Sequence, residues 1–131
     1  EIIKLNLSSN VKMLGIRQEI EKFLAISDLL VLTSHYEGFP TVFLEAIASK
    51  VPCISTDVGE VKEILDNESI VPIGDIEKIA SKIQKFYNNE SLRNQVLMKS
   101  MNKIKNYDWE NVAQSIKKIY INAVRKNRIK F

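Results

Sequence analysis

The chain has 131 residues, of which 45% are apolar, and a formal net charge of +3, as expected for one globular domain or part of one. No run of about eighteen apolar residues is present, which excludes a membrane-spanning helix, and no N-terminal pattern is typical of a signal peptide. The single cysteine, Cys53, excludes an intrachain disulfide, and its apolar neighbours predict a core position. Because the first residue is Glu1, we expect a piece of a longer protein.

Predicted strands and helices alternate along the chain. The first nine residues predict a helix end and a Ser-Ser-Asn turn, and apolar runs predict strands at residues 11–14, 29–33, 52–56 and 69–71. Apolar periodicity predicts helices at residues 18–25, 41–49, 61–65, 76–86, 90–105 and 109–126. This order predicts a parallel α/β sheet with right-handed crossovers. Because a doubly wound nucleotide-binding domain has about six strands, the sheet is expected to be truncated.

Ligands of open parallel sheets bind beyond the carboxyl ends of the strands. Three predicted loops lie there: residues 15–17, residues 34–40 and residues 57–59. The middle loop carries Glu37, whose carboxylate can accept hydrogen bonds from sugar hydroxyls, and Gly38, which lets backbone approach a ligand closely. His35, the only histidine, is not expected to be catalytic.

The helix predicted after this loop is apolar on all sides except at Glu45, so it is expected to be buried. A buried carboxylate needs hydrogen-bond donors, and the vicinal hydroxyls of a ribose would supply two. The alternative is that Glu45 lies at the helix edge, in water or paired with a lysine. Pro40 suits the first helical turn, and the free N–H groups of Thr41, Val42 and Phe43 would then form a diphosphate site. An ordinary loop-to-helix junction capped by Thr41 is the alternative.

The last fifteen residues are rich in cations. A basic tail can lie on anionic lipid, or it can be a solvated helix end whose cations suit the helix dipole. No aromatic residues interleave with these cations in the manner of a nucleic-acid-binding face, so nucleic acid is not an expected partner. The cations are Lys117, Lys118, Arg125, Lys126, Arg128 and Lys130.

The segment from Glu37 to Glu45 resembles the E-x7-E signature of group-one retaining glycosyltransferases with the GT-B fold. Other segments resemble the same family in order: Val11 to Gly15 its "V-x-F-x-G" strand, residues 27–34 its "A-D-V-x-V-x-P-S" strand, and residues 51–64 its "G-x-P-V-V-A-T-x-V-G-G-x-x-E-I" segment. Residues 70–75 resemble "G-L-L-V-P-x-x-D", and residues 107–109 resemble "F-S-W". Two positions depart from the pattern, because Lys50 and Glu60 stand where glycine is common.

The resemblance implies a Rossmann-like C-terminal half-domain that binds a nucleotide sugar. It makes residues 1–110 a partial donor-binding domain and residues 111–131 a basic helix that packs towards an N-terminal domain absent from this chain. Glu45 would bind the ribose, and Glu37 would act on the donor sugar as the catalytic residue. The remaining donor-binding residues would serve the base, sugar and phosphates: Gly15, Ile16, Arg17, Gly38, Phe39, Pro40, Thr41 and Val42.

The resemblance further implies metal-independent transfer with retention, without a cofactor, from a UDP-, GDP- or ADP-sugar to a glycan or lipid-linked acceptor. The expected setting is surface polysaccharide synthesis in the cytoplasm, at the inner face of the cell membrane. The chain alone is expected to be inactive, because the cationic clamp for the diphosphate and the acceptor domain would lie elsewhere, and to self-associate through its uncovered N-terminal flank. Two alternatives stay open: a stand-alone nucleotide-binding or interaction module, and a dinucleotide oxidoreductase, against which the missing G-x-G-x-x-G counts.

Overall fold

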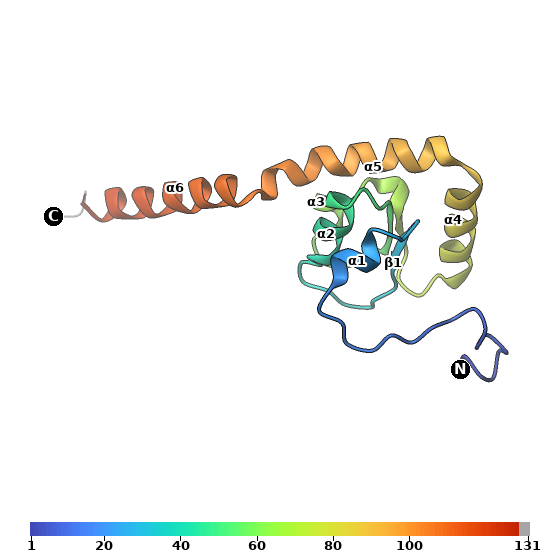
Figure 1. The fold of residues 1–131 in the computed structure, drawn as a ribbon. Helices are drawn as coiled ribbons and strands as arrows, with labels where there is room; N and C mark the ends of the chain where they lie inside the picture. Colours follow the sequence, from blue (N-terminus) through green and yellow to red (C-terminus); the bar gives the residue numbers. More distant parts are fainter. Residues whose placement is uncertain (129–131) are drawn as a thin grey trace.

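The computed structural model describes residues 1–128 and has an α/β fold built on a three-stranded parallel sheet (Figure 1). The strands are β1 (Leu30–Leu32), β2 (Cys53–Thr56) and β3 (Ile70–Val71), paired in the order β1-β2-β3. The α-helices are α1 (Ile20–Leu24), α2 (Val42–Ala48), α3 (Val61–Ile64), α4 (Ile76–Asn88), α5 (Glu90–Ile104) and α6 (Trp109–Arg128). Two short 3-10 turns, η1 (Asn67–Ser69) and η2 (Lys105–Tyr107), precede β3 and α6. The predicted α/β class and parallel sheet are therefore confirmed.

Alternate side chains of the strands serve two separate cores. Leu30, Leu32 and Cys53 pack in the cluster that contains the buried side chains of α2 and α3. Val31 and Ile54 pack instead with Phe86 of α4 and Val96 of α5. Figure 1 shows α1 and α2 on one side of the sheet and α4 on the other, with α5 running across the end of both layers. This period-two alternation is the reason that a short sheet can hold helices on both faces.

Cys53 confirms its predicted core position. The side chain is buried in the β2 strand, and this burial raises the pKa of the Cys53 thiol to about 12. Desolvation disfavours the charged thiolate, so the thiol stays protonated and behaves as a small apolar residue. The residue therefore belongs to the packing of the sheet.

The prediction of a strand at residues 11–14 was wrong. The described residues contain three strands rather than four, and Val11 to Leu14 pair with none of them. The three strands found are neighbours in sequence order, like strands 4, 5 and 6 of the doubly wound order 3-2-1-4-5-6, in which strand 3 does not touch strand 4. A strand needs a partner for its backbone groups, and this segment has none in the described sheet. Its side chains are not covered either, since Met13 is 82% exposed. The first residues form hydrogen-bonded turns rather than a helix end.

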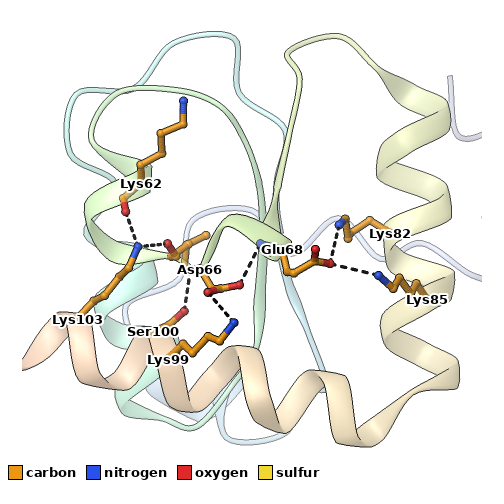
Figure 2. Close-up of polar contacts among 9 residues, drawn as sticks. Lys62, Asp66, Glu68, Lys82, Lys85, Lys99, Ser100 and Lys103 are labelled. Carbon is orange, nitrogen blue, oxygen red and sulfur yellow. Dashed lines mark hydrogen bonds and ion pairs between the residues drawn. The ribbon is translucent and has the colours of Figure 1, made fainter.

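A network of polar contacts fixes the start of β3 to two helices (Figure 2). Lys103 Nζ of α5 donates hydrogen bonds of 2.6 Å to the carbonyl oxygens of Lys62 and Leu65, where α3 ends. Asp66 N donates to Ser100 Oγ at 3.2 Å, and the Asp66 carboxylate pairs with Lys99 at 3.3 Å.

Glu68 extends this network to α4. Its carboxylate pairs with Lys85 at 3.2 Å and Lys82 at 3.5 Å, and the hydrogen bond from Lys85 is the largest cause of its lowered pKa. Because Glu68 is exposed, the two pairs contribute little stability individually. Together with the contacts of Lys103 and Ser100, they fix where β3 enters the sheet, and hence where its carboxyl end lies.

The end of α2 explains the first departure from the family pattern. Lys50 has a φ of 62°, in the left-handed region that favours glycine. Val51 N donates to Ala46 O at 2.8 Å and Lys50 N donates to Ile47 O at 3.0 Å, which together form a Schellman motif. Lys50 is thus the residue after the helix cap, where a glycine carries no Cβ penalty.

We expect Lys50→Gly to stabilise the chain by about 0.5–1 kcal/mol, because it removes the left-handed strain of a Cβ-bearing residue. Urea denaturation followed by circular dichroism measures the change. Lys50→Ala is the matched control, since it deletes the same exposed side chain and keeps the Cβ, and it should give no gain. Equal midpoints for the glycine and alanine variants would contradict the assignment.

The free edge of β1 generates a second prediction. Within the described residues β1 pairs only with β2, and exposed apolar side chains gather on the preceding segment. An open strand edge beside apolar surface promotes association between chains. We expect the mass of the 131-residue chain, measured by light scattering, to rise with concentration. A constant monomer mass at all concentrations would contradict this expectation.

Candidate functional site

The loop of residues 34–41 connects the carboxyl end of β1 to α2, and we refer to it as the β1–α2 loop. Its first part is tied to the neighbouring strand, because Thr56 Oγ1 of β2 donates a hydrogen bond of 2.6 Å to Ser34 O. Its middle part is tied to the turn after β2, because Glu60 N donates to Gly38 O at 3.1 Å. Pro40, just before α2, is buried. The loop that carries the E-x7-E pattern is therefore held at the carboxyl edge of the sheet by two hydrogen bonds and by the burial of Pro40.

Gly59 makes this arrangement possible. A Cβ atom at position 59 would lie 2.2 Å from Gly38 O and 2.4 Å from Glu37 O, closer than any real Cβ contact. The φ of Gly59 is 48°, which a residue with a side chain rarely adopts. The turn after β2 thus lies flush against the backbone of Glu37 and Gly38 because position 59 has no side chain.

The second departure from the family pattern, Glu60, leaves this contact intact. Glu60 has a φ of −89°, which any residue adopts, and it contributes a backbone N–H rather than a side chain. A glycine at position 60 is therefore not needed for the geometry of the turn.

Glu37 is half-buried within the β1–α2 loop. Ser34 Oγ donates a hydrogen bond of 2.7 Å to Glu37 Oε1, which restricts the carboxylate. A carboxylate that accepts one protein donor still has acceptor capacity on both oxygens. The predicted catalytic role of Glu37 is untested, but the side chain is positioned by its own loop.

Glu45 does not lie where its apolar neighbours predicted. The helix α2 buries Phe43, Ala46 and Ile47, but Glu45 is exposed, so the expectation of a buried carboxylate was wrong. At 100° per residue, Glu45 falls on the side of the helix turned away from Phe43. The alternative of a carboxylate at the helix edge describes the position. The ribose role of Glu45 stays a prediction, and an exposed carboxylate at this edge is accessible to a ligand.

The backbone N–H groups of the loop divide into two sets. Phe43 N donates to Pro40 O at 3.1 Å, so its predicted availability for a phosphate was wrong. In the part of the chain that the structure describes, the N–H groups of Gly38, Phe39, Thr41 and Val42 donate to no protein acceptor. Because α2 has only 7 residues, these local N–H groups are a firmer basis for anion binding than a helix dipole. The Thr41 side chain makes no capping bond, contrary to the alternative prediction.

The loop at Gly15, Ile16 and Arg17 stands apart from this arrangement. All three residues are exposed, and no hydrogen bond described in the structure joins them to the β1–α2 loop. Their predicted position near a base is untested. The structure also reveals a residue that the sequence did not single out, Tyr107 of η2, whose ring lies 5.2 Å from that of Phe39 at an interplanar angle of 44°. The likeness of residues 107–109 to "F-S-W" was the one signal for it.

Comparison with known proteins identifies the family. The model of the family described as glycosyl transferases group 1 matches residues 1–103. The chain therefore belongs to the group 1 glycosyltransferases, and its three-stranded α/β fold is that of the C-terminal domain of a GT-B enzyme. The oxidoreductase alternative does not fit this family.

Two curated relatives illustrate the range of the family. The chain is 28% identical over 128 residues to N-acetyl-alpha-D-glucosaminyl L-malate synthase of Bacillus anthracis, covering 95% of the chain and 34% of that protein. It is 44% identical over 69 residues to the capsular polysaccharide biosynthesis glycosyltransferase CapM of Staphylococcus aureus, covering 50% of the chain and 18% of that protein. The chain thus spans about a third or less of the length of these relatives.

Solved structures share the fold. Anabaena Alr3699/HepE in complex with UDP superposes with a TM-score of 0.85 at 22% identity, over 92% of this chain and 35% of that chain. The C-terminal domain of the group 1 family protein LpcC from Francisella tularensis superposes with a TM-score of 0.67 at 24% identity, over 80% and 57% of the two chains.

No described helix of the present chain is long and apolar enough to cross a membrane.

Substitutions at Gly59 and Gly74 can distinguish the cost of a steric clash from the cost of backbone strain. Gly59 and Gly74 both have positive φ, 48° and 76°, but a Cβ at Gly74 would meet nothing within 4 Å. We expect Gly74→Ala to cost about 1–2 kcal/mol from its φ alone, and Gly59→Ala to cost about 1–3 kcal/mol more, because the loop must move. Urea denaturation measures both costs. Equal costs would show that the close approach of the turn and the β1–α2 loop contributes nothing.

Proposed function

We propose that this chain is the donor-binding part of a retaining glycosyltransferase. The enzyme transfers a sugar from a nucleoside diphosphate, UDP, GDP or ADP, to a glycan or a lipid-linked acceptor. Family membership supports the reaction class, and the likeness to a capsular glycosyltransferase supports surface polysaccharide synthesis. We assign this synthesis to the cytoplasm, at the inner face of the membrane. The observation that carries the proposal is the β1–α2 loop, which is tied to β2 and the following turn. It carries Glu37 and several N–H groups that have no acceptor among residues 1–128, at the carboxyl edge of the sheet.

Each part of the donor meets a different group of the site. Glu45 accepts hydrogen bonds from the ribose hydroxyls, to which its exposed carboxylate is accessible. Glu37 faces the donor sugar and acts at the reacting centre, with its carboxylate oriented by Ser34. The N–H groups of Gly38, Phe39, Thr41 and Val42 bind the sugar and phosphates, while buried Pro40 sets the course of the loop. Gly15, Ile16 and Arg17 reach the base. No metal or cofactor is assigned to the site.

The helix α6 connects this domain to the acceptor side of the enzyme. We assign residues 1–110 to the donor domain and residues 111–131 to a basic C-terminal segment. Residues 111–128 lie in α6, and residues 129–131, with Lys130, lie outside the described residues. Figure 1 shows α6 leaving the body of the domain, and its apolar side chains Ile116, Ile119 and Tyr120 are exposed. We assign this apolar face to packing against the acceptor-binding domain, with the neighbouring cations available to anionic lipid.

A stand-alone module without catalysis is the alternative. It would keep nucleotide binding and show no transfer in the intact protein with any donor. A glycosyl product formed from a nucleotide sugar excludes it.

The two glutamates should separate binding from turnover. A carboxylate on two ribose hydroxyls makes charge-assisted hydrogen bonds worth about 1.5–3 kcal/mol each before compensation by water. We therefore expect Glu45→Gln to weaken donor binding about tenfold to a hundredfold. Glu37→Gln should lower turnover with a smaller effect on binding of the free nucleoside diphosphate, because its partner is the sugar.

Titration calorimetry of UDP, GDP and ADP with the intact enzyme and both variants measures these effects. Glu60→Gln is a control, since the Glu60 side chain is exposed and only its backbone N–H contacts the loop. If Glu45→Gln bound every nucleotide as tightly as the wild type, the ribose role would be wrong, and Glu45 would be an ordinary solvent-exposed helix residue.

A further inference from the structure

Tyr107 lies at the junction between α5 and α6, far from the β1–α2 loop in sequence. It ends the η2 turn, and Asp108 then starts α6 by accepting a hydrogen bond from Glu110 N at 3.1 Å on its side chain. Asn111 Nδ2 of α6 donates to Lys105 O at 3.0 Å, which binds the first turn of α6 back onto η2. Hydrogen bonds on both sides of Tyr107 therefore hold the junction.

The ring of Tyr107 reaches two parts of the proposed donor site. It packs against Phe39 with ring centroids 5.2 Å apart in a tilted geometry, which is favourable for two aromatic rings. It also lines an apolar hollow with Leu44 and Ile47 of α2 and Ile104 of α5. Tyr107 thus borders both the loop and the helix that follows the loop.

A movement of Phe39 would displace backbone N–H groups of the proposed donor site. Phe39 stands between Gly38 and Pro40, and its own N–H group is one of those without a protein acceptor among the described residues. The carbonyl of the preceding residue, Gly38, accepts a hydrogen bond from Glu60 N. The loop backbone is therefore fixed by the turn after β2 at Gly38 and by an aromatic side chain at Phe39.

We propose that Tyr107 is a positioning residue for the donor, which holds the N–H groups around Phe39 in place through its ring contact. This inference rests on the proposed function, since it assigns those N–H groups to a nucleotide sugar. Tyr107 does not touch the donor. It sets the loop from the junction at which α6 begins, so the donor loop and the start of α6 share one contact.

The test compares Tyr107→Leu, Tyr107→Phe and Phe39→Leu in the intact enzyme. Losing an aromatic pair of this kind should raise the dissociation constant and the KM for the nucleotide sugar about threefold to tenfold, with a smaller change in kcat. Tyr107→Phe keeps the ring and should retain wild-type affinity. The double variant Phe39→Leu/Tyr107→Leu should bind the nucleotide sugar about as tightly as the single variant of lower affinity, because each single substitution already removes the same ring contact. Tyr87→Leu, at an exposed tyrosine of α4, is the matched control and should change nothing.

Amide hydrogen exchange gives a readout that does not depend on a ligand. Tyr107→Leu should speed exchange at the N–H of Glu60, whose acceptor is Gly38 O, and Tyr87→Leu should not. Additive losses of affinity, or unchanged exchange at Glu60, would overturn the positioning role. If the wild-type enzyme bound none of the nucleotide sugars, the proposed function would fail, while the exchange experiment would still decide whether Tyr107 holds the loop.

Discussion

The close approach of two backbone segments at the carboxyl edge of the sheet is the constraint on which the site depends. The turn after β2 meets the β1–α2 loop at Gly59, where any side chain would occupy the space of Gly38 O. That contact allows Glu60 N to hold the Gly38 carbonyl, while the N–H groups of Gly38 and Phe39 have no acceptor among the described residues. Since protein interiors tolerate little change in volume, the loop cannot relax inward without losing this bond. A site made mainly of backbone groups is therefore as rigid as the turn behind it.

The helix α5 contacts the segment before β3, the core around α2 and the η2 turn that carries Tyr107. Lys103 and Ser100 hold the segment between α3 and β3, which fixes the third strand, and the same helix ends at the η2 turn that carries Tyr107. Its apolar residues Leu97, Met101 and Ile104 pack against the core that contains α2. One helix thus links the edge of the sheet, the helix after the donor loop and the start of α6.

Local patterns predicted most of the fold but not the environment of single side chains. The runs at Leu30 and Ile54 predicted buried parallel strands, because β-strands buried on both faces are apolar throughout. The apolar run around Glu45 predicted burial and was wrong, because apolar composition does not say which face of a short helix meets the core. The strand at Val11 failed because strand formation depends on a partner, which local sequence does not reveal. The contact between Phe39 and Tyr107 joins distant segments, and only the tertiary fold shows it.

The position of Trp109 has a practical consequence. It is the only tryptophan of the chain, it is 86% exposed, and it occupies the first position of α6. An indole in water emits at longer wavelength than one covered by protein or lipid. The tryptophan fluorescence of the molecule therefore reports, without an added label, whether the first turn of α6 is exposed to water or covered by another surface.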